Sequence, residues 1–276
     1  MNISNTRQTL AILLVSIGIF YFDTLKWLIV SWTNNAYYSH GFFIPIISGY
    51  LIWNMRKDLE NIEKKHSHEG LIIFIVGIVM YGIGSLMTIR FISGLSLIVT
   101  ISGLILYLYG WKFINKIKFP LLFLIFMIPL PIIDLAAPPV QTIAAAGSVK
   151  LANIVGIPVT RDGLLLNLPT GSLEVAIECS GLNSIISLMA LSCIFAFILD
   201  FGLIKKSIIF TSSIPIAMIS NILRITSVLA IGNKYGIEVA TGYFHSFSSL
   251  LLFSIALVGI YLVGRSFGRL NFRKTF

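Results

Sequence analysis

The stretch AIECSGLNSIISLMALSCIFAFIL, residues 176–199, joins a polar turn to a long apolar run. Its first nine residues hold a carboxylate, a thiol, two hydroxyls and an amide, whereas the remainder is almost wholly apolar. About 20 mostly apolar residues are enough for a helix to cross the ~30 Å hydrocarbon core of a bilayer. The stretch therefore predicts a transmembrane helix that begins directly after a cluster of reactive side chains.

The composition of the whole chain is that of a membrane protein. Of its 276 residues, 57% are hydrophobic and only 11% are charged, whereas a soluble domain carries roughly 25% charged residues. The net charge of +9 would suggest nucleic acid as a partner of a soluble protein. Here the basic residues stand in short connections between apolar runs and form no basic stripe, so we expect a lipid bilayer and no nucleic acid as partner.

Eight apolar segments are expected to span the membrane. They are residues 10–31, 40–55, 70–88, 91–110, 119–137, 183–200, 207–231 and 247–264. With a cytoplasmic N-terminus, fourteen of the twenty lysines and arginines fall in inner segments, and six, among them Lys26 and Arg90, fall in or near the outer half. By the positive-inside rule, the sequence predicts an α-helical integral membrane protein with about eight transmembrane helices and both termini cytoplasmic.

The outer stretch between the fifth and sixth spans, residues 138–182, differs from the rest. TIAAAGSVKLANIVGI (142–157) has apolar positions at helical spacing and predicts an interfacial or re-entrant helix. DGLLLNLPTGSLEVAIE (162–178) contains two β-type runs separated by Pro-Thr-Gly-Ser at 169–172, which predicts a short β-hairpin. The second run leads directly to Cys179.

Cys179 precedes the sixth span by a few residues, at a place that favours reactivity. We expect Ser180 to cap the helix and Gly181 to allow close backbone approach. The positive end of a helix dipole lowers the pKa of a thiol, and free N–H groups can hold an oxyanion. The alternative is a small buried hydrophobic residue, which is the expectation for Cys193 in mid-span. Glu178 adjoins the thiol but would point to the opposite face of a strand.

Two other spans bring polar residues to the same predicted depth. Arg224 lies near the outer end of the seventh span, and such residues usually face a cavity because insertion costs roughly 2.5–3.5 kcal/mol at a helix centre. Asn221, three residues earlier, shares its helix face. His40 and His245 both stand at outer ends of spans. A nucleophile, a cation and a base at one depth make Cys179, Arg224 and His245 a candidate catalytic set.

In these segments the chain resembles the exosortase/archaeosortase family of membrane-embedded cysteine transpeptidases. The resemblance rests on YSHGFFIPIISGYLIW (38–53), FPLLFLIFMIPLP (119–131), GIPVTRDGLLLNLPTGSLEVAIECSGLNS (156–184), NILRI (221–225) and FHS (244–246). The Cys-Ser-Gly stretch, followed by N-x-x-R and then by His, is specific as a combination. Ser249 stands near a place where the family pattern often has glycine, which leaves the subfamily open.

This resemblance implies one membrane domain over residues 1–276 and an active site on the outer face of the cell membrane. It implies catalytic roles for Cys179, Arg224 and His245, beside supporting or substrate-binding residues that we assign to His40, Asn221, Ser180 and Glu178. The implied substrates are exported proteins that end in a short motif, a hydrophobic span and a basic tail, and the acceptor belongs to the cell envelope. No metal ion and no cofactor are expected.

Two other functions stay open on the sequence alone. A purely hydrolytic intramembrane cysteine protease would differ only in using water to resolve the thioester. A transporter of small solutes or lipid-linked sugars would use Arg224 and Asn221 to bind an anion, although the paired broken spans of many transporters are not apparent.

Overall fold

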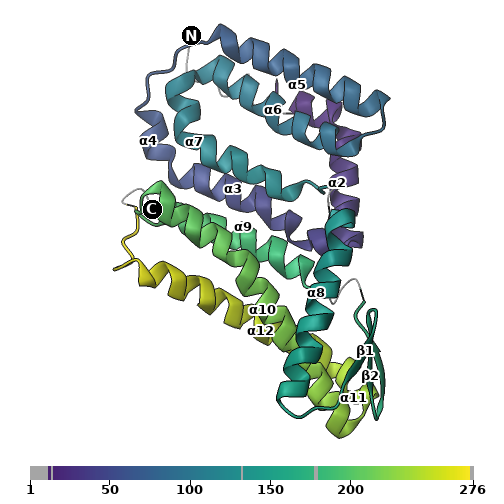
Figure 1. The fold of residues 1–276 in the computed structure, drawn as a ribbon. Helices are drawn as coiled ribbons and strands as arrows, with labels where there is room; N and C mark the ends of the chain where they lie inside the picture. The colour runs from purple at the N-terminus through teal and green to yellow at the C-terminus, as the bar shows by residue number, and fades with distance from the viewer. Residues whose placement is uncertain (1–11, 14, 132, 177–179, 274–276) are drawn as a thin grey trace. The chain divides into compact units, whose positions relative to one another are not determined.

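The computed structural model describes residues 12–13, 15–131, 133–176 and 180–273. It is mostly helical and consists of two compact units, Met1–Leu130 and Pro131–Phe276, whose elements are labelled in Figure 1. Several helices are long and apolar enough for a membrane. The chain is therefore a helical membrane protein, as its composition predicts.

The first unit is built from helices alone. Its elements are α2 (Phe22–Asn34), the 3-10 helix η1 (Ala36–Phe42), α3 (Phe43–Asn54), α4 (Arg56–Glu60), α5 (His68–Leu86), α6 (Arg90–Tyr109), α7 (Trp111–Phe123) and the 3-10 helix η2 (Leu124–Met127). The closest pair is α5 and α6, which run antiparallel and touch along their length. These two helices form the frame of this unit.

Glycines at seven-residue spacing explain the close contact between α5 and α6. Gly70, Gly77 and Gly84 are all buried on one face of α5. A Cβ at Gly77 would lie 2.3 Å from Oγ1 of Thr100, and one at Gly84 would lie 2.7 Å from Oγ of Ser93. In a membrane the hydrophobic effect does not drive helix association, because lipid tails are as apolar as the side chains. Small residues stabilise the pair instead by letting the two helix backbones pack closely.

Three described helices are long and apolar enough to cross a membrane, namely α5, α6 and α10 (Leu203–Tyr235). With 19 and 20 residues, α5 and α6 are about 28 and 30 Å long, which matches the hydrocarbon core. Shorter apolar helices are α9 (Leu182–Ile198) and residues Leu250–Ser266 of α12 (Tyr243–Ser266). The count of eight spans and their orientation stay predictions.

The predicted fifth span, residues 119–137, breaks near its end, as the prolines of this stretch lead one to expect. The helix ends in η2, and the next helix, α8 (Ile133–Ile154), takes in the helix predicted over 142–157. Pro129 and Pro131 lie in this break. They account for it, because proline lacks an N–H group and disfavours helix in the residue before it.

Two aromatic side chains satisfy the backbone of this broken segment within the first unit. Trp32 donates its indole N–H to the carbonyl oxygen of Met127 at 2.8 Å. The Tyr38 hydroxyl donates to the carbonyl of Leu130 at 3.2 Å and accepts from its N–H at 2.7 Å. A break in a helix inside a membrane protein is tolerated where such partners replace the lost backbone hydrogen bonds.

The second unit combines helices with a small sheet. Its elements are α8, β1 (Thr160–Asp162), β2 (Leu165–Leu168), β3 (Gly171–Glu174), α9, α10, α11 (Ile237–Thr241) and α12. The strands form an antiparallel sheet in the order β1-β2-β3. The sequence interpretation had two strands joined by a turn at 169–172; in the structure β1 is a third strand, and Gly171 and Ser172 already belong to β3. The sheet lies beside α8, α10 and α11 (Figure 1).

One hydrophobic core joins this sheet to two helices. Leu166 of β2 and Leu229 of α10 are fully buried, and they pack with Ala145 and Ala152 of α8 and with Val175, just after β3. Small alanines on α8 let the sheet lie close to this helix. The core therefore fixes the chain up to residue 175 against α8 and α10, a few residues before Cys179.

Candidate active site

The chain enters α9 through a turn held by hydrogen bonds on both sides. Ser180 is 1% exposed, and its hydroxyl accepts a hydrogen bond from the N–H of Leu182 at 3.1 Å. Its carbonyl oxygen accepts one from Nδ2 of Asn221 on α10 at 2.8 Å. The helix begins at Leu182, one residue before the expected span 183–200, and the N-cap position is Gly181 rather than Ser180. The predicted cap is thus off by one residue, because a left-handed residue stands between the serine and the helix.

Gly181 is the residue that allows this close approach. Its φ angle is +84°, and a Cβ at this position would lie 2.5 Å from Cγ and 2.7 Å from Cβ of Asn221. Glycine adopts a positive φ without steric cost, unlike residues with a Cβ. The amide of Asn221 therefore occupies the space that any side chain at 181 would need, and it locks the turn next to the sequence position of Cys179.

Two further contacts hold the strands that lead into this turn. Gln141 of α8 is buried and donates from Nε2 to the carbonyl of Val175 at 3.4 Å. Thr170, in the turn between β2 and β3, donates its hydroxyl to the carbonyl of Gly232 on α10 at 2.9 Å. The segment that delivers residues 176–180 is thereby tied to both helices of the core.

Arg224 is buried on α10, one helical turn after Asn221, and is 7% exposed. It lines a small cavity between α9, α10 and α12 together with Ser184, Leu188 and Phe253. The cavity volume is about 10 Å³, which is room for about one water molecule. The guanidinium is therefore held in a tight, largely desolvated place beside the start of α9, where its charge is screened far less than in water.

Arg224 directly precedes the part of α10 that packs against the sheet. Ile225 and Leu229, which follow it on α10, belong to the core beneath the strands. An open sheet edge is not tolerated in lipid, because its unpaired backbone groups find no partner there. With 33 residues, α10 is about 50 Å long and exceeds the ~30 Å core. Helix α10 is thus longer than the hydrocarbon core, and the sheet packs against its C-terminal part from Ile225 onward, directly after Arg224.

Helix α12 carries His245 and returns along α10 (Figure 1). The hydroxyl of Ser220 on α10 donates to the carbonyl of Leu252 on α12 at 2.7 Å. Counting from this contact along the two antiparallel helices puts residue 248 about level with Arg224, and the backbone of His245 about one turn further. The backbone of His245 therefore lies about one helical turn from the level of Arg224 along this helix pair; its catalytic role stays a prediction.

His40 belongs to the first unit, in η1 and outside the helices long enough to span the membrane. Its imidazole forms hydrogen bonds with the backbone of Phe126 and Tyr37. The supporting role that we assign to it stays a prediction.

The structure brings together Ser180, Asn221 and Arg224 from the predicted set. Cys179 and Glu178 lie outside the described residues, and only the backbone of His245 is described. Sequence reasoning missed Gln141 and Thr170, because the contacts of a side chain with a distant backbone carbonyl leave no local pattern. No group of three or more His, Cys, Asp or Glu residues that could hold a metal ion occurs in the described ranges.

Gly181→Ala is expected to lower the thermal unfolding temperature and the activity more than Gly156→Ala. Both glycines have almost the same φ, +84° and +82°, but a Cβ at Gly156 meets nothing within 4 Å. Gly156→Ala should therefore cost only the left-handed strain of about 1–2 kcal/mol, whereas Gly181→Ala adds the clash with Asn221. Thermal unfolding in detergent measures both, and equal losses would contradict the proposed close approach.

The chain was compared with protein families, with curated proteins and with solved structures. The family model of the transmembrane exosortases covers residues 32–262, which is most of the chain and includes Ser180, Asn221 and Arg224. No curated protein and no solved structure matches the chain.

Proposed function

Because the chain belongs to the transmembrane exosortase family, we propose that it cleaves the C-terminal sorting signal of exported proteins and transfers the new C-terminus to an acceptor of the cell envelope. At the level of the family it is a membrane transpeptidase or protease that acts on proteins with sorting signals. The observation that carries the proposal for this chain is the buried Arg224 beside the braced turn at Ser180 and Gly181.

Acyl transfer would begin at Cys179. Its thiolate attacks the carbonyl carbon of the scissile peptide bond, so that a carbon–sulfur bond forms and the carbonyl oxygen takes the negative charge. When the tetrahedral intermediate collapses, the carbon–nitrogen bond breaks and His245 gives a proton to the leaving amine. His245 then takes a proton from the acceptor, which attacks the thioester and releases the thiolate of Cys179.

Arg224 is the group that we expect to stabilise the oxyanion. A buried guanidinium is costly by itself, and its interaction with a developing negative charge is strong where water is excluded. N–H groups at the start of α9 would add to this stabilisation, because the left-handed Gly181 precedes the helix directly. Arg224 lies next to a sheet whose open edges lipid cannot cover, which supports cleavage at the membrane boundary. By the predicted topology this boundary is on the outer face.

The contacts of Asn221 favour an enzyme over an anion transporter. Its Nδ2 atom donates to the carbonyl of Ser180, and its side chain packs on Gly181. These contacts brace a turn between two helices, whereas a transport site would need the amide for the solute. We therefore assign Asn221 a positioning role.

Mass spectrometry of the product tests transfer against hydrolysis. The probe is a tagged exported protein from the same genome that ends in a motif, a hydrophobic span and a basic tail, co-expressed with the full chain. A new C-terminus that carries an adduct is the expected result, because an acceptor amine or hydroxyl resolves the thioester. A free carboxylate in every product molecule would instead establish the hydrolytic protease.

A further inference from the structure

A polar hollow in the first unit has no part in the proposed reaction. Its volume is about 420 Å³, and it is lined by α2, α5, α6 and the turn between the last two. Three charged residues face it, Asp23 and Lys26 of α2 and Arg90 at the first position of α6. Two cations and one carboxylate in a hollow of this size suit a ligand with a single negative charge.

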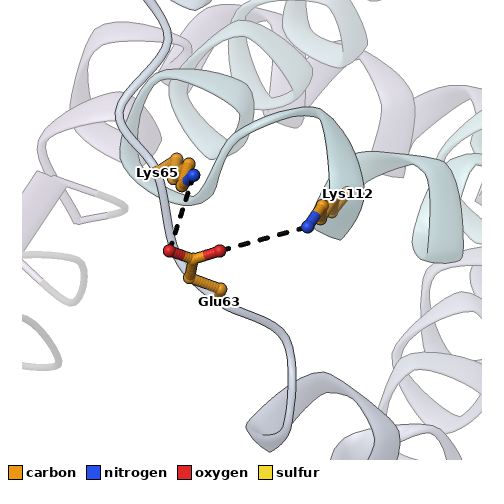
Figure 2. A network of polar contacts seen from close by, with 3 residues as sticks. All are labelled: Glu63, Lys65 and Lys112. Atoms are coloured by element: carbon orange, nitrogen blue, oxygen red, sulfur yellow. Dashed lines mark ion pairs between the residues drawn. The ribbon is translucent and has the colours of Figure 1, made fainter.

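Within the part of the chain that the structure describes, the charged side chains of this hollow form no close ion pair with one another. Across the described ranges, no ion pair within 4.0 Å involves Lys26 or Arg90. The contrast is the far end of α5 and α6, where Glu63 contacts Lys65 at 3.5 Å and Lys112 at 4.0 Å (Figure 2). Lysines there have a carboxylate partner, whereas the two cations of the hollow are open to a ligand.

The position of the hollow along α5 and α6 is that of lipid headgroups. Both helices match the thickness of the hydrocarbon core, so the turn between them, residues 87–89, lies at a membrane boundary. Trp27 lines the hollow, and tryptophan is enriched at this level. Leu86 and Met87 beside it are 87% and 62% exposed. Acyl chains would cover these two residues while the headgroup fills the hollow.

We propose that this hollow binds the phosphate ester of a membrane lipid. Lys26 and Arg90 would contact the phosphate oxygens, and Asp23 would accept hydrogen bonds from a hydroxyl or ammonium group of the same headgroup. Free inorganic phosphate offers the same oxygens, but it lacks the chains that would cover Leu86 and Met87. The lipid is therefore the ligand that the surroundings of the hollow favour.

Native mass spectrometry of the full chain in detergent tests this site by titration with phosphatidylglycerol. The dissociation constant of the first bound lipid should rise about fivefold for Lys26→Gln or Arg90→Gln, which is the attraction that one basic residue adds to an anionic headgroup. For both substitutions together it should rise about 25-fold, because the two effects multiply. Asp23→Asn should lower it severalfold, because it removes a negative charge beside the phosphate. Lys112→Gln is the matched control, since this exposed lysine lies at the far end of the helix pair, and it should leave the constant unchanged.

Two further ligands test whether the site recognises a lipid phosphate, the lipid chains alone or free phosphate. Diacylglycerol with the same chains should bind much more weakly and with no loss in the double variant, and an excess of inorganic phosphate should not displace the lipid. Equal lipid binding by the double variant and Lys112→Gln would overturn the site. Equal binding of diacylglycerol would show recognition of chains alone, and displacement by inorganic phosphate would show a site for the free ion; either result overturns the lipid assignment.

Discussion

Cys179→Ala is expected to leave the tagged substrate at full length, with the rate of cleavage lowered by at least about 10³-fold. The thiolate forms the covalent bond of the proposed intermediate, and no other side chain in the proposed set can replace it. Immunoblotting of the substrate and the size of its product give the measurement. Shortened product at the wild-type rate would show that Cys179 is not the nucleophile.

Cys193→Ala provides the matched control for this experiment. Cys193 lies within α9, fourteen residues after Cys179, and is only partly buried. A helix rises about 1.5 Å per residue, so Cys193 lies about 16 Å along the helix from its start at Leu182. We expect Cys193→Ala to keep most of the activity, which would separate the loss of one reactive thiol from a general effect of removing cysteine.

Arg224→Gln is expected to lower kcat by about 10²–10³-fold, the loss typical when one donor to an oxyanion is removed. Glutamine keeps a hydrogen-bond donor but removes the charge. Arg224→Lys should recover part of the loss, since lysine keeps the charge but lacks the planar fork of the guanidinium. Single-turnover cleavage of the tagged substrate by the purified chain is the measurement.

Lys234→Gln is the control for Arg224, because it removes a cation from the last turn of the same helix, where the side chain is exposed. Its cleavage rate should stay within about twofold of wild type, as expected for a surface charge. Thermal unfolding of Arg224→Gln must also be followed, since the side chain is buried. A folded Arg224→Gln variant with unchanged kcat would exclude Arg224 from the reaction.

Local patterns in the sequence predicted much of the site. The apolar run that follows the polar turn predicted a helix over residues 183–200, and α9 begins at Leu182. Helical spacing put Asn221 and Arg224 on one face of α10, and both are buried. These features depend on residues a few positions apart, which is why the sequence could reveal them. The combination of Cys, Arg and His motifs also identified the family correctly.

Long-range contacts decided the rest. The sequence by itself determined a helical membrane protein of the exosortase family, because apolar runs and short motifs are local. Only the tertiary structure decided how the broken end of the predicted fifth span keeps its backbone satisfied, since Trp32 and Tyr38 supply the hydrogen bonds from another segment. Only the tertiary structure showed that Asn221 fills the space above Gly181, 40 positions earlier in the chain, because such a steric fit between two elements leaves no periodicity to read.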